Sequence, residues 1–178
     1  MKQITDRKHV LTKLIKDNKF TSYCEVGVWK GFTIKHIINS CPGIRAVGVD
    51  PLSTVYDYCD EFPCLMGEPK KSQEELDEIA KDLERFEGLE FVRARSEKVV
   101  DNFPDGSFDL VFLDAVHIYD CIAADIDAWL PKVRKGGILS GHDYTPLDTY
   151  KNGVKQAVDE RFGERVNTDV DAVWWVRI

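Results

Sequence analysis

Apolar residues along the chain switch between two spacings, and each switch marks a new element. Short apolar runs rich in β-formers predict strands, and apolar residues three or four positions apart predict helices. The predicted strands cover residues 22–28, 44–50, 89–94, 108–114, 136–143 and 172–178, with Val166 in a short partner strand before the last one. The predicted helices lie within residues 1–20, 34–41, 76–83, 118–130 and 154–162. This alternation predicts an α/β fold in which helices cover both faces of a parallel sheet.

The segment from Pro51 to Lys71 interrupts the alternation. It carries aromatic and acidic residues and is too long for an ordinary connection, which favours a lid or a substrate loop. A disordered or merely packed excursion is the alternative. Ser72 and Glu75 then form the capping box of the next helix. No repeat, low-complexity tract or Gly/Ser linker divides the chain, so we expect a single domain over residues 1–178.

Composition narrows the class of ligand. The chain has 178 residues, 43% of them hydrophobic, and a formal net charge of −7. This acidity disfavours a nucleic-acid partner, because binding phosphates requires clustered Lys and Arg. No stretch approaches ~18 continuous apolar residues and the first 20 lack an apolar signal segment, so we expect no membrane partner and a cytoplasmic location. Five cysteines without a CxxC pair give no zinc motif, and a small molecule is the expected partner.

Polar residues fall at the carboxyl ends of the predicted strands. They are Glu25, Asp50, Ser96, Asp114 and the pair His142 and Asp143. In open α/β sheets, ligands bind in the crevice outside these ends, where the strand order reverses. The pattern therefore predicts one site at this edge, with Glu25 at the turn after its strand and outside the core.

The turn after the first strand carries a second signal. Gly27, Gly31 and Thr33 form a G-x-x-x-G-x-T pattern. Glycines let the backbone come close to a ligand, and the amides at a helix N-terminus favour anionic groups. The spacing is not the G-x-G-x-x-G of dinucleotide-binding folds. Asp50 is placed to accept hydrogen bonds from a ribose, or else forms a turn before Pro51.

These segments together resemble class I S-adenosylmethionine-dependent methyltransferases over nearly the whole chain. The stretch "EVGVWKGFT" resembles the first glycine motif of that family, and "VGVD" resembles its ribose-binding acidic end. The stretch "FDLVFLDAVHIYDCIAADIDAWLPKVRKGGILSGHDY" resembles the small O-methyltransferase-like branch that includes macrocin-type and novobiocin-type sugar O-methyltransferases. The resemblance implies a Rossmann-like three-layer sandwich with a mostly parallel seven-stranded sheet and an antiparallel last strand.

The resemblance also implies roles for individual residues. It places Glu25 near the methionine ammonium of the methyl donor, and Asp50 at the donor's ribose. The residues implied to bind the donor are Glu25, Gly27, Val28, Gly31, Thr33, Asp50, Arg95, Ser96 and Asp114, with Arg95 or Ser96 bordering the adenine. A cationic sulfonium and ammonium ligand favours an edge with several carboxylates, which agrees with these roles.

A metal site is a further implication of the resemblance. Similar metal-dependent O-methyltransferases hold Mg²⁺ with acidic residues at positions that map onto Asp114, His142 and Asp143. Because hard cations prefer oxygen ligands, His142 weakens the case for Mg²⁺ and leaves Mn²⁺ or no metal as alternatives.

The general base is a second departure from those relatives. They often carry an acidic residue where this chain has Val116, which cannot accept a proton. His117 is the nearest replacement, since an imidazole with an ordinary pKa near ~6.5 suits removing a proton from a hydroxyl. A helix cap or a surface residue is the alternative for His117, and His142 is the competing base if no metal binds.

The function expected from the resemblance is S-adenosylmethionine-dependent methylation of a hydroxyl on a small molecule, such as a sugar or a phenolic natural product. A non-catalytic sensor or partner subunit that binds the same cofactor is one alternative, supported by Val116. A nicotinamide-dependent oxidoreductase is another, against which the missing G-x-G-x-x-G counts. A homodimer is a further expectation, because aromatic residues of the segment 51–71 suit either a pocket or a subunit interface.

Overall fold

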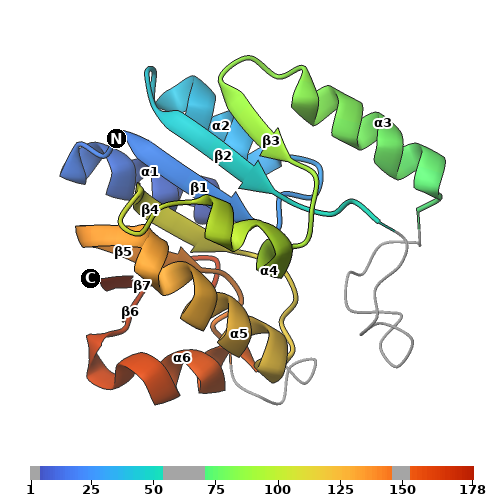
Figure 1. The fold of residues 1–178 in the computed structure, drawn as a ribbon. Helices are drawn as coiled ribbons and strands as arrows, with labels where there is room; N and C mark the ends of the chain where they lie inside the picture. The colour runs from blue at the N-terminus through green and yellow to red at the C-terminus, as the bar shows by residue number, and fades with distance from the viewer. Residues whose placement is uncertain (1–4, 54–70, 146–152) are drawn as a thin grey trace.

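The computed structural model describes residues 5–53, 71–145 and 153–178 as a central sheet with helices on both faces (Figure 1). Most of the predicted lid, residues 54–70, lies outside these described residues. The strands are β1 (Ser22–Val26), β2 (Arg45–Val49), β3 (Leu89–Val92), β4 (Phe108–Leu113), β5 (Val133–Gly141), β6 (Asn167–Thr168) and β7 (Trp174–Arg177). The helices are α1 (Arg7–Asn18), α2 (Phe32–Ser40), α3 (Gln73–Glu84), α4 (Ser96–Val99), α5 (Tyr119–Trp129) and α6 (Val154–Phe162).

The sheet has the order β3-β2-β1-β4-β5-β7-β6. Strands β1 to β5 pair in parallel, whereas β7 runs antiparallel to both β5 and β6. The Rossmann-like sheet with an antiparallel last strand is therefore confirmed. The chain winds outward from β1 to β3 and then returns to place β4 on the other side of β1, so the strand order reverses between β1 and β4.

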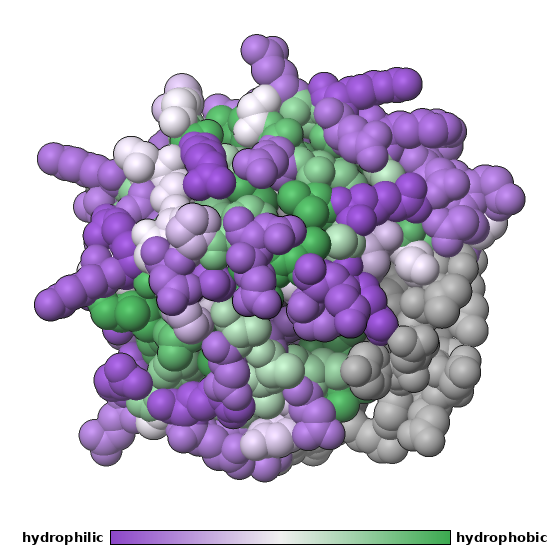
Figure 2. All heavy atoms as spheres, in the orientation of Figure 1, coloured by the Kyte–Doolittle hydropathy of each residue, from purple (hydrophilic) through white to green (hydrophobic). Residues whose placement is uncertain are grey.

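Two apolar layers cover the sheet. Residues of α1, α2 and α3 pack on one face, in a layer that includes Leu11, Ile34 and Leu76. Residues of α4, α5 and α6 pack on the other face, in a layer that includes Ile126 and Trp174. On the face shown in Figure 2, hydrophilic side chains are scattered over the surface, with smaller hydrophobic areas between them. The expected three layers are therefore present.

Local signals account for most boundaries. The Ser72 side chain accepts a hydrogen bond from the Glu75 amide, and the Glu75 side chain accepts one from the Ser72 amide, which confirms the predicted capping box. The structure adds α4, a single turn whose four residues are too few to produce a helical apolar pattern. It also places Val166 just before β6 rather than in it, because the two-residue strand begins at Asn167.

A buried carboxylate joins the beginnings of β1 and β4. Oδ2 of Asp109 accepts hydrogen bonds from the Thr21 amide at 2.6 Å and from the Ser22 amide at 2.9 Å. Both hydroxyls of these residues also donate to it, and Arg134 forms an ion pair with Oδ1. Burial raises the pKa of Asp109, but these hydrogen bonds outweigh it and lower the pKa to about 2. The clamp holds β1 and β4 in register.

We expect Asp109→Asn to lower the free energy of unfolding by about 2 kcal/mol at pH 7, because the amide loses the charge that these donors stabilise. The carboxyl has a lower pKa in the folded state than its ordinary value of 3.8. Its contribution is therefore complete above that value and is lost as the pH falls through about 2. Urea unfolding at several pH values measures the difference between the two proteins.

Asp101→Asn is the matched control, since Asp101 is an exposed aspartate on the surface after α4. It should change the unfolding free energy by less than about 0.5 kcal/mol. Equal effects of the two substitutions, or a difference that does not shrink in acid, would show that the clamp is not a source of stability.

Candidate functional site

Backbone hydrogen bonds bring the carboxyl ends of the central strands together. The Gly27 amide donates to the Val49 carbonyl at 2.9 Å, and the Asp114 amide donates to the Val26 carbonyl at 2.8 Å. The His142 amide donates to the Leu113 carbonyl at 3.1 Å. The ladder thus continues one residue past each strand, and the side chains expected at this edge come from adjacent chain segments.

Glu25 lies deeper than expected. It is inside β1, only 2% exposed, and its Oε2 accepts a hydrogen bond from the Tyr23 hydroxyl at 2.6 Å. The expectation that Glu25 lies outside the core is therefore wrong for this structure, because residues two apart on a strand share a face and Tyr23 can reach it. Burial, with Asp114 and Asp50 nearby, raises the pKa of Glu25 to about 8, although the Tyr23 hydrogen bond and Arg7 act against this.

Packing within the protein explains why the turn after β1 contains a glycine. Gly27 has φ +91°, and a Cβ built on it would lie 2.3 Å from the Asp114 carbonyl oxygen. Gly31 has φ +76° and precedes α2 as its N-cap. Val28 and Thr33 are both buried, at 4% and 6% exposure. The glycine at position 27 is thus required by the close passage of β4, whatever ligand the turn faces.

Asp50 lies directly after β2, is 8% exposed and serves the turn through both oxygens. Oδ2 accepts from the Trp29 amide at 2.8 Å, and Oδ1 accepts from the Leu52 amide at 2.8 Å. Burial raises the pKa of Asp50, against these hydrogen bonds. Each carboxylate oxygen can accept a second hydrogen bond, so the turn role and the ribose role are compatible.

Arg95 and Ser96 lie where β3 leads into α4. Arg95 is the N-cap residue of α4, and its Nε lies 3.6 Å from Glu97. The Ser96 hydroxyl donates to Oδ1 of Asp125 in α5 at 2.6 Å. Burial raises the pKa of Asp125 to about 6. The Ser96 side chain therefore joins α4 to α5, and an adenine contact through its hydroxyl would compete with Asp125.

Four residues after β4 and β5 form a compact group, which we call the histidine–aspartate cluster: Asp114, His117, His142 and Asp143. Nδ1 of His117 lies 2.9 Å from Asp143, and Nδ1 of His142 lies 3.1 Å from the same carboxylate. Asp143 has φ +56°, a left-handed backbone that is uncommon for a non-glycine residue and is found preferentially at functional sites.

Charge in this cluster changes the expected role of His117. Burial lowers the pKa of His117, but the carboxylates of Asp114 and Asp143 have the larger effect and raise this pKa to about 9. The same carboxylates raise the pKa of His142 against the effect of burial, and both histidines hold the pKa of Asp143 far below its ordinary value despite burial. His117 is therefore protonated at neutral pH, and in this state it cannot accept a proton as the predicted base.

The cluster also changes the expected metal ligands. Among the described residues, the group whose donor atoms all lie within 4.8 Å of one another is Asp114, His117 and Asp143. It keeps both predicted aspartates but contains His117 in place of His142. Nε2 of His117 is buried, 3.6 Å from Asp114, and has no hydrogen-bond partner among the described residues. One nitrogen and two carboxylates fit a borderline cation such as Mn²⁺ better than Mg²⁺.

Sequence reasoning missed two residues of this edge. Arg7, from the start of α1, has Nε 3.5 Å from Asp114, and Asp171, from the turn before β7, lies 3.7 Å from His142. Neither is part of a motif, since they are brought to the site by tertiary packing from opposite ends of the chain. Only the apolar pattern of α1 gave an indirect signal, because it predicts that this helix packs on the sheet.

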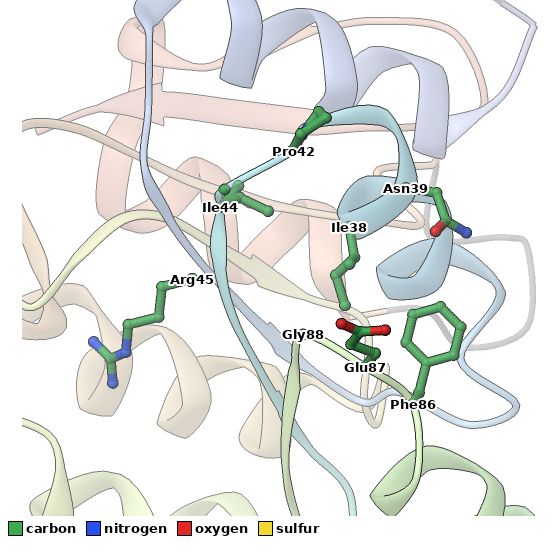
Figure 3. Close-up of a pocket in the computed structure, with 9 residues that line it drawn as sticks. Ile38, Asn39, Pro42, Ile44, Arg45, Phe86, Glu87 and Gly88 are labelled. Carbon is green, nitrogen blue, oxygen red and sulfur yellow. The ribbon is translucent and has the colours of Figure 1, made fainter.

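A hollow of about 620 Å³ lies elsewhere on the molecule (Figure 3). It is lined by Ile38, Asn39, Pro42, Gly43, Ile44, Arg45, Phe86, Glu87 and Gly88. These residues end α2, begin β2 and precede β3, so the hollow is at the amino ends of the strands. It is therefore opposite to the edge that gathers the polar residues.

Comparison with known families decides the class of protein. The sequence profile of a family described as a methyltransferase domain matches residues 24–144, more than half of the chain. The chain belongs to this methyltransferase family. The matched segment includes the glycine turn, Asp50 and the histidine–aspartate cluster. No curated protein matches the sequence.

Solved structures agree on the fold of this methyltransferase. NovP, an O-methyltransferase, has a TM-score of 0.66 at 17% identity, and the match covers 93% of this chain and 75% of NovP. An O-methyltransferase from Bacillus cereus in complex with S-adenosylhomocysteine has a TM-score of 0.58 at 15% identity, with 95% and 79% covered. TomG from Streptomyces achromogenes, in complex with S-adenosylmethionine, has a TM-score of 0.58 at 13% identity, with 94% and 78% covered. The chain therefore has the fold of these O-methyltransferases, and the family match over residues 24–144 confirms the expected methyltransferase family. Within the described residues, no helix is long and apolar enough to cross a membrane.

The glycine turn gives a direct test of the site's construction. Gly27→Ala should lower the free energy of unfolding by about 3 kcal/mol or more, because it combines a left-handed backbone with a backbone clash. Gly43→Ala is the matched control, since φ is +84° but nothing lies within 4 Å of its Cβ position. It should lose only about 1–2 kcal/mol. Thermal or urea unfolding compares them, and similar losses would contradict the close approach of β4.

Proposed function

We propose that this methyltransferase transfers a methyl group from S-adenosylmethionine to a hydroxyl oxygen of a small molecule. The observation that carries the proposal is the position of Glu25, Asp50 and Asp114 at the ends of β1, β2 and β4, around the Gly27 turn. This is the point at which the strand order reverses, where open α/β sheets bind ligands. The carboxylates there suit a cationic ligand.

Two carboxylates beside the glycine turn suit different parts of the proposed methyl donor. Glu25 suits the methionine ammonium, because a buried carboxylate gains more from a cation than an exposed one. Asp50 suits the ribose, whose hydroxyls can donate to the remaining lone pairs of its oxygens. The donor itself supplies an electrophilic methyl group on a sulfonium. The protein's part is to hold the acceptor in line with that methyl while the acceptor's proton passes to a base, for which His142 is the proposed group when no metal binds.

The metal site belongs to the same proposal. Asp114, His117 and Asp143 would hold a divalent cation, with Mn²⁺ favoured over Mg²⁺ by the imidazole ligand. A bound cation would lower the pKa of an acceptor hydroxyl. Because a metal-ligating histidine is neutral, metal binding would also release the proton that the raised pKa keeps on His117 without a metal.

The most specific part of the proposal is the chemical class of the methyl acceptor. NovP and the Bacillus cereus protein are described as O-methyltransferases, and TomG takes part in tomaymycin synthesis. By analogy we propose a sugar or phenolic hydroxyl as the acceptor. The homodimer and the cytoplasmic location stay predictions.

Titration calorimetry with S-adenosylhomocysteine tests the proposal, with NAD as the control ligand. Micromolar binding of S-adenosylhomocysteine without NAD binding is the expected result. Methyl transfer to a panel of sugar and phenolic hydroxyls, with and without Mn²⁺, then tests catalysis. Donor binding without turnover would favour the sensor alternative, for which Val116 is the supporting residue. Preference for NAD would overturn the proposal.

Glu25 makes a sharper prediction about the same binding event. Its pKa of about 8 means that the unliganded carboxyl is mostly protonated at pH 7. A ligand ammonium favours the carboxylate, so binding should release a proton and the affinity should rise between about pH 6 and pH 8. Calorimetry at pH 7 in phosphate and in Tris should give binding enthalpies that differ, because Tris takes up the proton with more heat.

Glu25→Gln is the matched variant, since it keeps the size and the acceptor for Tyr23 but cannot ionise. It should bind S-adenosylhomocysteine about 10-fold to 100-fold more weakly, with no dependence of the enthalpy on the buffer. Equal enthalpies in both buffers for the unmodified protein would contradict a protonated Glu25. An unchanged affinity with a lower melting temperature would give Glu25 a purely structural role.

A further inference from the structure

Arg7 reaches the proposed site from a fixed point on the backbone. It is the first residue of α1, whose N-cap Asp6 accepts a hydrogen bond from the His9 amide. The Arg7 amide donates to Oδ2 of Asp171 at 3.0 Å, which ties the start of α1 to the turn before β7. The main chain is therefore held from two sides, while the long side chain extends toward the ends of β4 and β5.

The guanidinium is held only loosely there. Its Nε lies 3.4 Å from the Thr33 hydroxyl and 3.5 Å from Oδ2 of Asp114. Its Nη1 lies 3.3 Å and 3.4 Å from the two ring nitrogens of His142. Tight charge-assisted pairs are shorter, about 2.7–2.9 Å. The side chain is also 37% exposed, so it can swing into solvent without unfolding α1.

The charges around the guanidinium explain why it is there. In the described part of the chain, Arg7 is the only lysine or arginine that forms an ion pair with Asp114, which is itself 13% exposed. Arg7 also lies beside the His142 ring, a group that would repel the guanidinium if it carried a proton. The guanidinium is stable beside an imidazole because the negative charge of the nearby carboxylates attracts it. The space between Asp114 and His142 is therefore built to hold positive charge.

We propose that Arg7 is the built-in counter-ion of the unliganded site and gives way when a cationic ligand binds beside Asp114. The ligand is either a divalent metal ion or the sulfonium of the donor; the first rests on the metal site of the proposed function and the second on its donor site. Both bring positive charge to the same carboxylate, so Arg7 and the ligand compete. Arg7 thus stabilises the empty site and opposes its occupation, and its displacement frees His142 from the guanidinium.

The test compares Arg7→Gln with Lys8→Gln. Lys8 is the matched control, because it is the next residue of α1, is 38% exposed and pairs with Asp6 rather than with the site. Thermal unfolding without ligand should show a lower melting temperature for Arg7→Gln and little change for Lys8→Gln. Calorimetric titration with Mn²⁺ alone, and separately with S-adenosylmethionine and S-adenosylhomocysteine, measures the competition.

For Arg7→Gln we expect Mn²⁺ affinity, or the ratio of S-adenosylmethionine to S-adenosylhomocysteine affinity, to rise about fivefold or more, the usual lower range of a coupling between sites. A rise for Mn²⁺ alone identifies the metal as the competitor, and a rise in the ratio identifies the sulfonium. Lys8→Gln should change neither. Weaker binding by Arg7→Gln would mean that Arg7 contacts the ligand, and unchanged binding would mean no competition; either result overturns the inference.

Two further results keep this test separate from the proposed function. Tighter Mn²⁺ binding by Arg7→Gln in a protein that does not bind S-adenosylhomocysteine would support the counter-ion and overturn the methyl-donor site. If Arg7→Gln does not fold, Arg7→Lys keeps the charge but cannot span Thr33, Asp114 and His142 with a planar fork. It should bind the cation more tightly than the unmodified protein, and equal or weaker binding overturns the inference.

Discussion

The parallel hydrogen-bond ladder of β1, β2 and β4 is the constraint on which the rest of this structure depends. It continues past the strand ends through the amides of Gly27, Asp114 and His142, so residues distant in sequence end at the same edge. The Asp109 clamp secures the opposite edge of β1 and β4. Once the register is set, the carboxylates of Glu25, Asp50 and Asp114 must share a small region.

Gathering carboxylates in this way has an electrostatic cost, and the protein offsets it differently for each one. Glu25 is buried beside the Tyr23 hydroxyl, and its raised pKa keeps it protonated at neutral pH. Asp50 instead accepts a hydrogen bond from a backbone amide of the glycine turn. Asp114 lies beside a guanidinium, and Asp143 lies beside two imidazoles. These are the means by which a protein keeps acidic groups at a site before a cationic ligand arrives.

The compensation links the site to the periphery of the fold. Arg7 and Asp171 come from opposite ends of the described chain, yet each lies within 4 Å of a member of the histidine–aspartate cluster. The start of α1 and the turn before β7 therefore border the carboxyl edge of the sheet. A methyltransferase with few catalytic groups of its own depends on such positioning, because an in-line transfer needs geometry more than it needs reactive side chains.

The sequence by itself determined the order of the elements, the family and the edge at which polar residues gather. The spacing of apolar residues predicts strands and helices directly. The glycine turn and the acidic residues at strand ends are local patterns, so they can be recognised without tertiary information. The identity of the groups facing one another was decided only by tertiary structure. The burial of Glu25, the presence of His117 beside Asp114 and Asp143, and the position of Arg7 all depend on distances across the sheet. Periodicity reports which face a residue lies on, but protonation and ligand geometry depend on neighbours that are far apart in the chain.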